Sequence, residues 1–239
     1  MKKLNKSDDF QRKPAIIAGV SLILMTLAAF FSYGYVHSSL VFHEDANRTY
    51  DLLQSSLSLL HLGMTGWVVV IFTDLIVTWA FYKVLKPIHS FYALLAGVLR
   101  LFYTIILATA VFHLWMVSQV IQSDSGSATQ VMENILRFEK IWSLGLIVFG
   151  IHLIMVGMAA SKAGFIPKVL SGLLILAGMS YLFIHSMYQA FPQYETSTAT
   201  IETILSLPMM IGELGFGMWL LVKGNKVKSS TRQSYLGAS

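Results

Sequence analysis

Six apolar runs of membrane-spanning length constrain the fold of this chain more than any other feature of its sequence. A helix that crosses a bilayer needs about 20 predominantly apolar residues, because each residue adds only about 1.5 Å along the axis. The runs therefore predict an all-α integral membrane bundle of six transmembrane helices. The predicted spans are residues 15–36, 61–82, 90–119, 141–161, 166–190 and 204–222.

Composition agrees with a membrane protein and excludes cysteine chemistry. The chain is 55% hydrophobic and 12% charged, whereas a soluble domain carries about 25% charged residues. It has no cysteine, so disulfides, thiolate metal sites and cysteine nucleophiles are all excluded. A metal ion would have to be held by His, Asp and Glu. The longer outer loops, 37–58 and 121–138, have room for short interfacial helices.

The distribution of basic residues predicts the orientation of the spans. Lys and Arg lie at the two ends of the chain and in alternate loops, which is the pattern of cytoplasmic segments. These residues include Arg12, Lys13, Lys83, Lys86, Lys162, Lys168, Lys223 and Lys226. We therefore expect a cytoplasmic basic N-terminus (1–14), a transmembrane domain (15–223) and a cytoplasmic polar tail (224–239). The first apolar run is too long for a signal peptide and is expected to remain as an anchor.

Four ionisable side chains interrupt the apolar runs at similar depth: Asp74, Arg100, His152 and Glu213. Counting at 1.5 Å per residue puts each of them roughly 13–20 Å from the cytoplasmic ends of the spans, in the middle of a core about 30 Å thick. Each charge there costs roughly 2.5–3.5 kcal/mol on insertion scales, so we expect the four to meet one another or line a wet cavity. A hairpin at 83–87 makes the second and third spans neighbours and predicts an Asp74–Arg100 pair.

The charge balance of this polar layer predicts that it takes up one proton or cation. With His152 neutral, two carboxylates face one guanidinium, and the proton could sit on either Glu213 or His152. Pro208 and nearby glycines predict a kink beside Glu213. The alternative is a static network that locks the packing of the helices.

Four further residues lie near the outer ends of the spans and are candidate metal ligands: His61, His113, His185 and Glu139. Imidazole and carboxylate groups suit zinc and similar ions. Their spacing matches no metal motif, and histidines also sit comfortably at membrane interfaces, so we expect no metal and no cofactor. His37 and His43 follow the first span.

Several segments resemble a bacterial membrane family known as domain-of-unknown-function family 4386. They are Tyr82–Pro87, Leu94–Leu101, Phe149–Gly157, Ser161–Gly172, Ala177–Tyr181 and Gly212–Gly224. The four residues of the polar layer match polar positions of the family pattern, whereas the first span and both long outer loops match poorly. The resemblance implies a multi-pass protein of the bacterial plasma (inner) membrane and brings no established activity.

Three functions remain open from the sequence. The first is a binding protein, transporter- or sensor-like, that holds a small ligand, ion or proton at the polar layer. The second is a lipid-active enzyme with an outer histidine metal site. The third is a non-catalytic immunity or stress-related protein, in which the layer only stabilises the bundle. The lipid bilayer is the expected partner, and nucleic acid is not, because orientation explains the basic residues.

Overall fold

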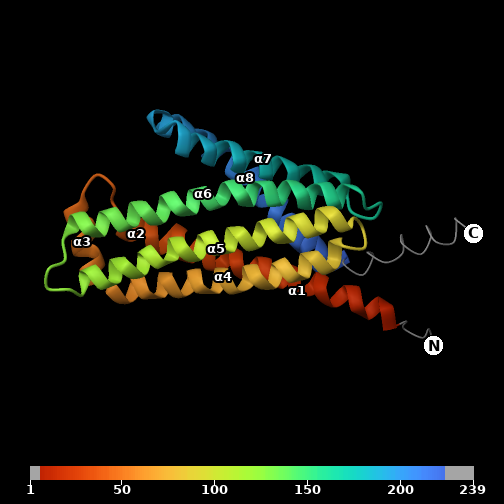
Figure 1. The fold of residues 1–239 in the computed structure, drawn as a ribbon, viewed down its shortest axis with the longest axis horizontal. Coiled ribbons are helices and arrows are strands. Elements are labelled where there is room, and N and C mark those ends of the chain that lie inside the picture. Colours follow the sequence, from red (N-terminus) through yellow and green to blue (C-terminus); the bar gives the residue numbers. More distant parts are fainter. Residues whose placement is uncertain (1–5, 224–239) are drawn as a thin grey trace, which may run out of the picture.

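The computed structural model describes residues 6–223, and these residues form a bundle of long helices with no strand among them (Figure 1). Six stretches of the described chain are long and apolar enough to cross a membrane, which confirms the predicted six-span, all-α architecture. The predicted tail, 224–239, lies outside the described residues. The six long helices are α1 (Lys6–Ala29), α4 (Leu57–Leu85), α5 (Ser90–Ile121), α6 (Ala128–Ser161), α7 (Lys168–Ala190) and α8 (Glu195–Lys223).

Four short elements complete the fold and connect the outer ends of the long helices. The π-helical segment η1 continues α1 without a break, and η2 is a single 3₁₀ turn between α7 and α8. These elements are η1 (Phe30–His37), α2 (Ser38–Leu40), α3 (Ala46–Ser55) and η2 (Pro192–Tyr194). α1 begins and α8 ends at one end of the bundle, and α3 covers the opposite end (Figure 1). The assignment of the first end to the cytoplasm stays a prediction.

The two outer loops differ in how they fold. In 37–58, α3 is a separate helix, capped by a hydrogen bond from the Arg48 backbone N–H to the Asp45 carboxylate (2.9 Å). In 121–138, residues from Ala128 onward belong to α6 instead of forming a separate interfacial helix. The reason is a capping box at Ser127 and Gln130 that starts α6 directly after the turn. α6 is therefore about 50 Å long and extends beyond a 30 Å hydrocarbon core.

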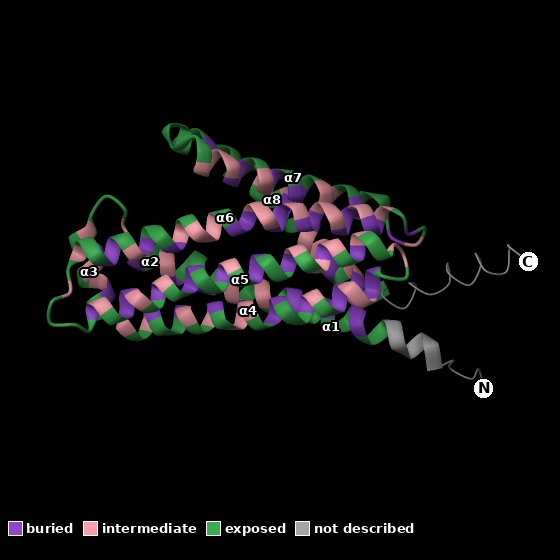
Figure 2. Ribbon diagram, in the orientation of Figure 1, coloured by how far each residue is buried: buried purple, intermediate pink, exposed green. Residues whose placement is uncertain are grey.

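The buried side chains form two clusters. The larger one follows the seams between the six long helices, and buried and exposed residues alternate along each helix (Figure 2). Many of the exposed residues are large and apolar, as expected where lipid is the solvent. The smaller cluster joins α3 to the outer ends of α4, α5 and α6. Its buried members are Val36, Leu40, Leu53, Leu60, Val117, Ile121, Val131 and Ile135. The outer end is thus a packed cap rather than a set of loose loops.

α6 and α7 approach each other closely at a pair of glycines. A Cβ added to Gly178 would lie 2.5 Å from the backbone oxygen of Gly150, and a Cβ at Gly150 would lie 2.6 Å from the backbone oxygen of Gly178. Small residues allow such contact between membrane helices. The contact fixes the position of His152 on α6 relative to Tyr181 on α7. Pro208 lies within α8, which is helical on both sides of it.

Candidate functional site

Three of the four predicted polar residues meet in the middle of the bundle. Asp74 on α4, Arg100 on α5 and His152 on α6 are buried, with exposed fractions of 0%, 1% and 0%. Nε and Nη2 of Arg100 lie 2.9 Å and 2.6 Å from Oδ1 of Asp74, and Nη1 lies 3.1 Å from Nε2 of His152. The structure therefore brings the Asp74–Arg100 pair together and adds His152 to it.

The hydrogen bonds of His152 define which of its nitrogens carries the proton. Arg100 can only donate, so Nε2 of His152 must accept from it. Nδ1 lies 2.8 Å from the backbone oxygen of Ala96, which can only accept, so Nδ1 must carry the hydrogen. His152 is thus a neutral imidazole with both nitrogens engaged. A second proton on Nε2 would remove the lone pair that accepts from Arg100, so proton uptake at His152 would break this contact.

One carboxylate oxygen in this group has no partner. Both close contacts from Arg100 go to Oδ1 of Asp74, and the buried Oδ2 makes no hydrogen bond among the described residues. Nη2 of Arg100 also lies 3.4 Å from the Met25 sulfur on α1. The rings of Phe81 and Phe149 lie 5.8 Å and 5.3 Å from the guanidinium carbon, so apolar faces surround the charge.

Glu213 stands apart from the other three. It lies on α8 and is only partly buried. Its carboxyl group is close enough to Tyr181 on α7 and to Arg100 on α5 to interact electrostatically with both. No ion pair to Glu213 occurs within residues 12–223. The structure therefore divides the predicted layer into a closely paired triad and a separate carboxyl group.

The predicted outer metal candidates do not come together. Each histidine has a polar partner of its own on a neighbouring helix: His61 with Ser118 (2.8 Å), His113 with Asn134 (3.1 Å) and His185 with Ser143 (3.1 Å). The three histidines lie on three different helices, α4, α5 and α7. A similar depth in the membrane therefore does not bring their side chains close to one another. Glu139 is the exception, because it joins two other histidines.

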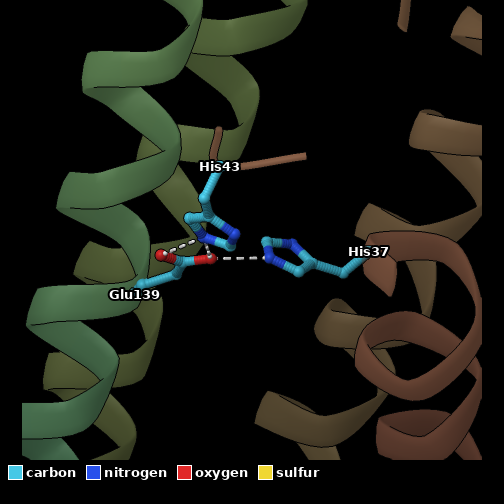
Figure 3. A group of neighbouring side chains, drawn as sticks. All are labelled: His37, His43 and Glu139. Atoms are coloured by element: carbon cyan, nitrogen blue, oxygen red, sulfur yellow. Dashed lines mark hydrogen bonds and ion pairs between the residues drawn. The ribbon is translucent and has the colours of Figure 1, made fainter. Parts of the chain in front are cut away.

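Glu139 on α6 contacts His37 at the end of η1 and His43 in the following loop (Figure 3). Nε2 of His37 lies 2.8 Å from Oε1 of Glu139, and Nε2 of His43 lies 2.9 Å and 3.0 Å from its two oxygens. The side chains of His37, Glu139 and His43 are 9%, 21% and 53% exposed. Solvent can therefore reach this outer cluster on the side of His43, whereas the side of His37 is buried.

Sequence reasoning missed the outer cluster because its members are far apart along the chain. His37 and Glu139 are separated by 102 residues, and only the path of the loop after η1 brings His43 to them. The single available signal was a pair of histidines just after the first span. The proximity of Tyr181 to Glu213 was also missed, since nothing in the sequence shows which faces of α7 and α8 meet.

Comparison with known proteins agrees with the resemblance found in the sequence. A family model described as "Domain of unknown function (DUF4386)" matches residues 17–224. An uncharacterized protein of the archaeon Archaeoglobus fulgidus is 27% identical over 165 residues, which cover 69% of this chain and 85% of the relative. No solved structure matches the chain. Because the family model spans most of its length, this membrane-helical bundle belongs to the DUF4386 family.

Proposed function

We propose that the protein is a membrane-embedded binding protein, of transporter or sensor type, that takes up a proton or small cation at the polar layer. The observation that carries the proposal is the unpartnered Oδ2 of Asp74, an anionic oxygen that is fully buried. Buried polar atoms without a partner are rare and call for an occupant. The missing contact of Oδ2 would be supplied by a proton, by a cation, or by a water molecule that is bound to a cation.

The charges of the layer favour a positively charged occupant. Arg100 compensates one carboxylate, and His152 is neutral because of its hydrogen bonds. Asp74 and Glu213 together then carry one negative charge more than Arg100 provides. Intramembrane carboxylates of this kind serve as proton and ion sites in many carriers. Glu213 has no ion-pair partner within residues 12–223, which supports it as the group that takes up the proton.

A second function, a purely structural lock, is favoured by the triad itself. Nε, Nη1 and Nη2 of Arg100 all have partners, and the triad joins three consecutive long helices. In that case the layer stabilises the bundle and binds nothing. The lipid-active enzyme has the weakest support, because the three histidines proposed for its metal site have separate partners.

Proton flux into liposomes that contain the purified protein tests the proposal. We expect flux in the wild type, measured with a pH-sensitive dye, and its loss in Glu213→Gln, which keeps the shape of the side chain but cannot ionise. Glu195→Gln is the matched control, because Glu195 is an exposed carboxyl residue of the same helix. If sodium replaces protons as the cargo, the same variants are compared by sodium uptake. If the proton flux and the sodium flux of Glu213→Gln both equal those of wild type, the proposal is wrong and the polar layer has a structural role only.

A further inference from the structure

We propose that His37, His43 and Glu139 form a binding site for a divalent transition-metal ion such as Zn²⁺ at the outer end of the bundle. This site is separate from the polar layer, and the inference does not depend on the proposed function. The three side chains supply two imidazole nitrogens and a carboxylate oxygen that all lie within 4.8 Å of one another. Two histidines and one carboxylate are a familiar ligand set for zinc, with the fourth position left to water.

An ion would have to draw the three ligand atoms, which lie within 4.8 Å of one another, to the separations of a coordination shell, and the half-exposed His43 side chain has room to move. In a tetrahedral site with bonds of about 2.0–2.1 Å, neighbouring ligand atoms lie about 3.3 Å apart. The imidazole–carboxylate separations of 2.8–3.0 Å need to widen by a few tenths of an ångström. The ion would take the place of the imidazole protons that now face Glu139, since a ligating nitrogen must be unprotonated.

His37 is held in position before any ion binds. It ends the π-helical segment η1, and such segments are rare and frequent at functional sites. The ring of Tyr33 stacks on the imidazole with centroids 4.8 Å apart, and the ring of Phe138 lies 5.8 Å away. These contacts restrict the rotation of the ring and leave Nε2 directed at Glu139 (Figure 3). A preset ligand lowers the entropic cost of binding.

The loop that carries His43 is also fixed. The hydroxyl of Thr49 accepts from the Phe42 backbone N–H at 2.8 Å and donates to the Phe42 backbone oxygen at 3.0 Å. Thr49 is fully buried, and the Arg48 guanidinium lies over the Phe42 ring at 3.7 Å. α3 therefore holds Phe42, the residue immediately before His43, in place. The backbone position of His43 is fixed, although its side chain is half exposed.

A small hollow, lined mostly by apolar side chains, lies beside His37. His37 lines it together with Ser32, whose hydroxyl is buried and has no partner among the described residues. The space open to the centre of a water molecule is ≈ 20 Å³, which is enough for about one water. A water there would satisfy Ser32 beside the ligand.

The depth of the site fits access from water. At 1.5 Å per residue, Glu139 lies roughly 33 Å along α6 from Ser161, just beyond a hydrocarbon core about 30 Å thick. His43 is half exposed on the solvent side of Glu139. An ion would therefore enter from the aqueous phase at the end opposite to the start of α1 and the end of α8. The imidazole nitrogens favour Zn²⁺, Co²⁺ or Ni²⁺ over Mg²⁺ and Ca²⁺, which prefer oxygen ligands.

Metal titration of the purified full-length protein in detergent, first stripped with a chelator, tests the site. We expect one Zn²⁺ per chain by elemental analysis, and Co²⁺ to give the visible absorption of a low-symmetry four-coordinate site. His43→Gln and Glu139→Gln should bind Zn²⁺ at least about 10-fold more weakly by calorimetry. Neither change removes core packing, because both side chains are partly exposed. Gel filtration of each variant verifies that it is folded.

Two matched controls distinguish Zn²⁺ binding at the outer cluster from Zn²⁺ binding to other histidines and carboxylates on the surface. His61→Gln removes an exposed outer histidine that is bonded to Ser118, and Glu133→Gln removes an exposed carboxylate of α6. Both should bind Zn²⁺ as the wild type does. Equal Zn²⁺ binding by His43→Gln and wild type would overturn the site, as would equal binding of Ca²⁺ and Zn²⁺. If folded wild type binds none of these ions, the proposal is wrong, and the three side chains only form hydrogen bonds that join the loop after η1 to α6.

Discussion

The polar layer and the outer cluster both combine carboxylate and histidine side chains, but they differ in burial and in the presence of an arginine. In the layer, the histidine and Asp74 both contact Arg100, so the protein supplies its own cation in a buried place. In the outer cluster, the ion-pair partners of Glu139 among the described residues are two histidines, and one of them is half exposed. Arg100 therefore compensates the charge of Asp74 from within the protein, whereas a positive charge on the outer cluster has to come from protons on its histidines or from an ion in solution.

The largest effect should come from removing the built-in cation. Arg100→Met leaves the carboxylate of Asp74 buried without its partner, and breaking a buried pair in this way costs about 3–5 kcal/mol. We expect a markedly lower Tm in detergent. The double variant with Asp74→Asn removes both charges and should recover a large part of the loss. A single variant as stable as wild type would mean that the triad does not hold the helices together.

A smaller loss should follow from separating α6 and α7 beside the layer. Gly178→Ala places a Cβ 2.5 Å from the Gly150 oxygen, so the helices must move apart, at a cost of about 1–3 kcal/mol. The matched control is Gly172→Ala on the same helix, where an added Cβ meets nothing within 4 Å. The control should be neutral or slightly stabilising, because alanine favours helix. The Tm values of the two variants measure the difference, and equal values would argue against close contact between α6 and α7.

The smallest effect on stability should come from the outer cluster. In metal-free buffer, His43→Gln should change the free energy of unfolding by no more than about 0.5 kcal/mol, because the side chain is 53% exposed. The same substitution should remove the stabilisation that Zn²⁺ gives to wild type. Chemical denaturation with and without the ion measures both quantities. A loss in metal-free buffer as large as that of Arg100→Met would show that the two regions do not differ as described.

Hydropathy and residue counting predicted much of the fold, for physical reasons that particular residues illustrate. The spans followed from the length of the apolar runs, and the Asp74–Arg100 pair followed from the hairpin that makes α4 and α5 neighbours. Depth along a helix can be counted, but the direction that a side chain faces around the axis cannot. Glu213 therefore has the predicted depth and still lies apart from the triad.

The outer cluster could not be predicted from spacing, because its geometry depends on tertiary contacts. The π-helical turn of η1 aims His37, and the bond between Thr49 and Phe42 positions the loop before His43. Neither leaves a periodic pattern in the sequence. The outer part of α6 was likewise expected as a separate helix, because the apolar run that marks the span begins near Ile141, well after the cap at Ser127.

The change in Tm on adding Zn²⁺ to metal-free wild type, Glu213→Gln and Glu139→Gln shows whether the outer cluster binds the ion. At about 100 times the Kd, an ion that binds only the folded state adds about 2.7 kcal/mol, which is a shift of several degrees. We predict this shift in wild type and in Glu213→Gln, and its absence in Glu139→Gln. A shift that persists in Glu139→Gln, or that is absent from wild type, would contradict a metal site formed by His37, His43 and Glu139.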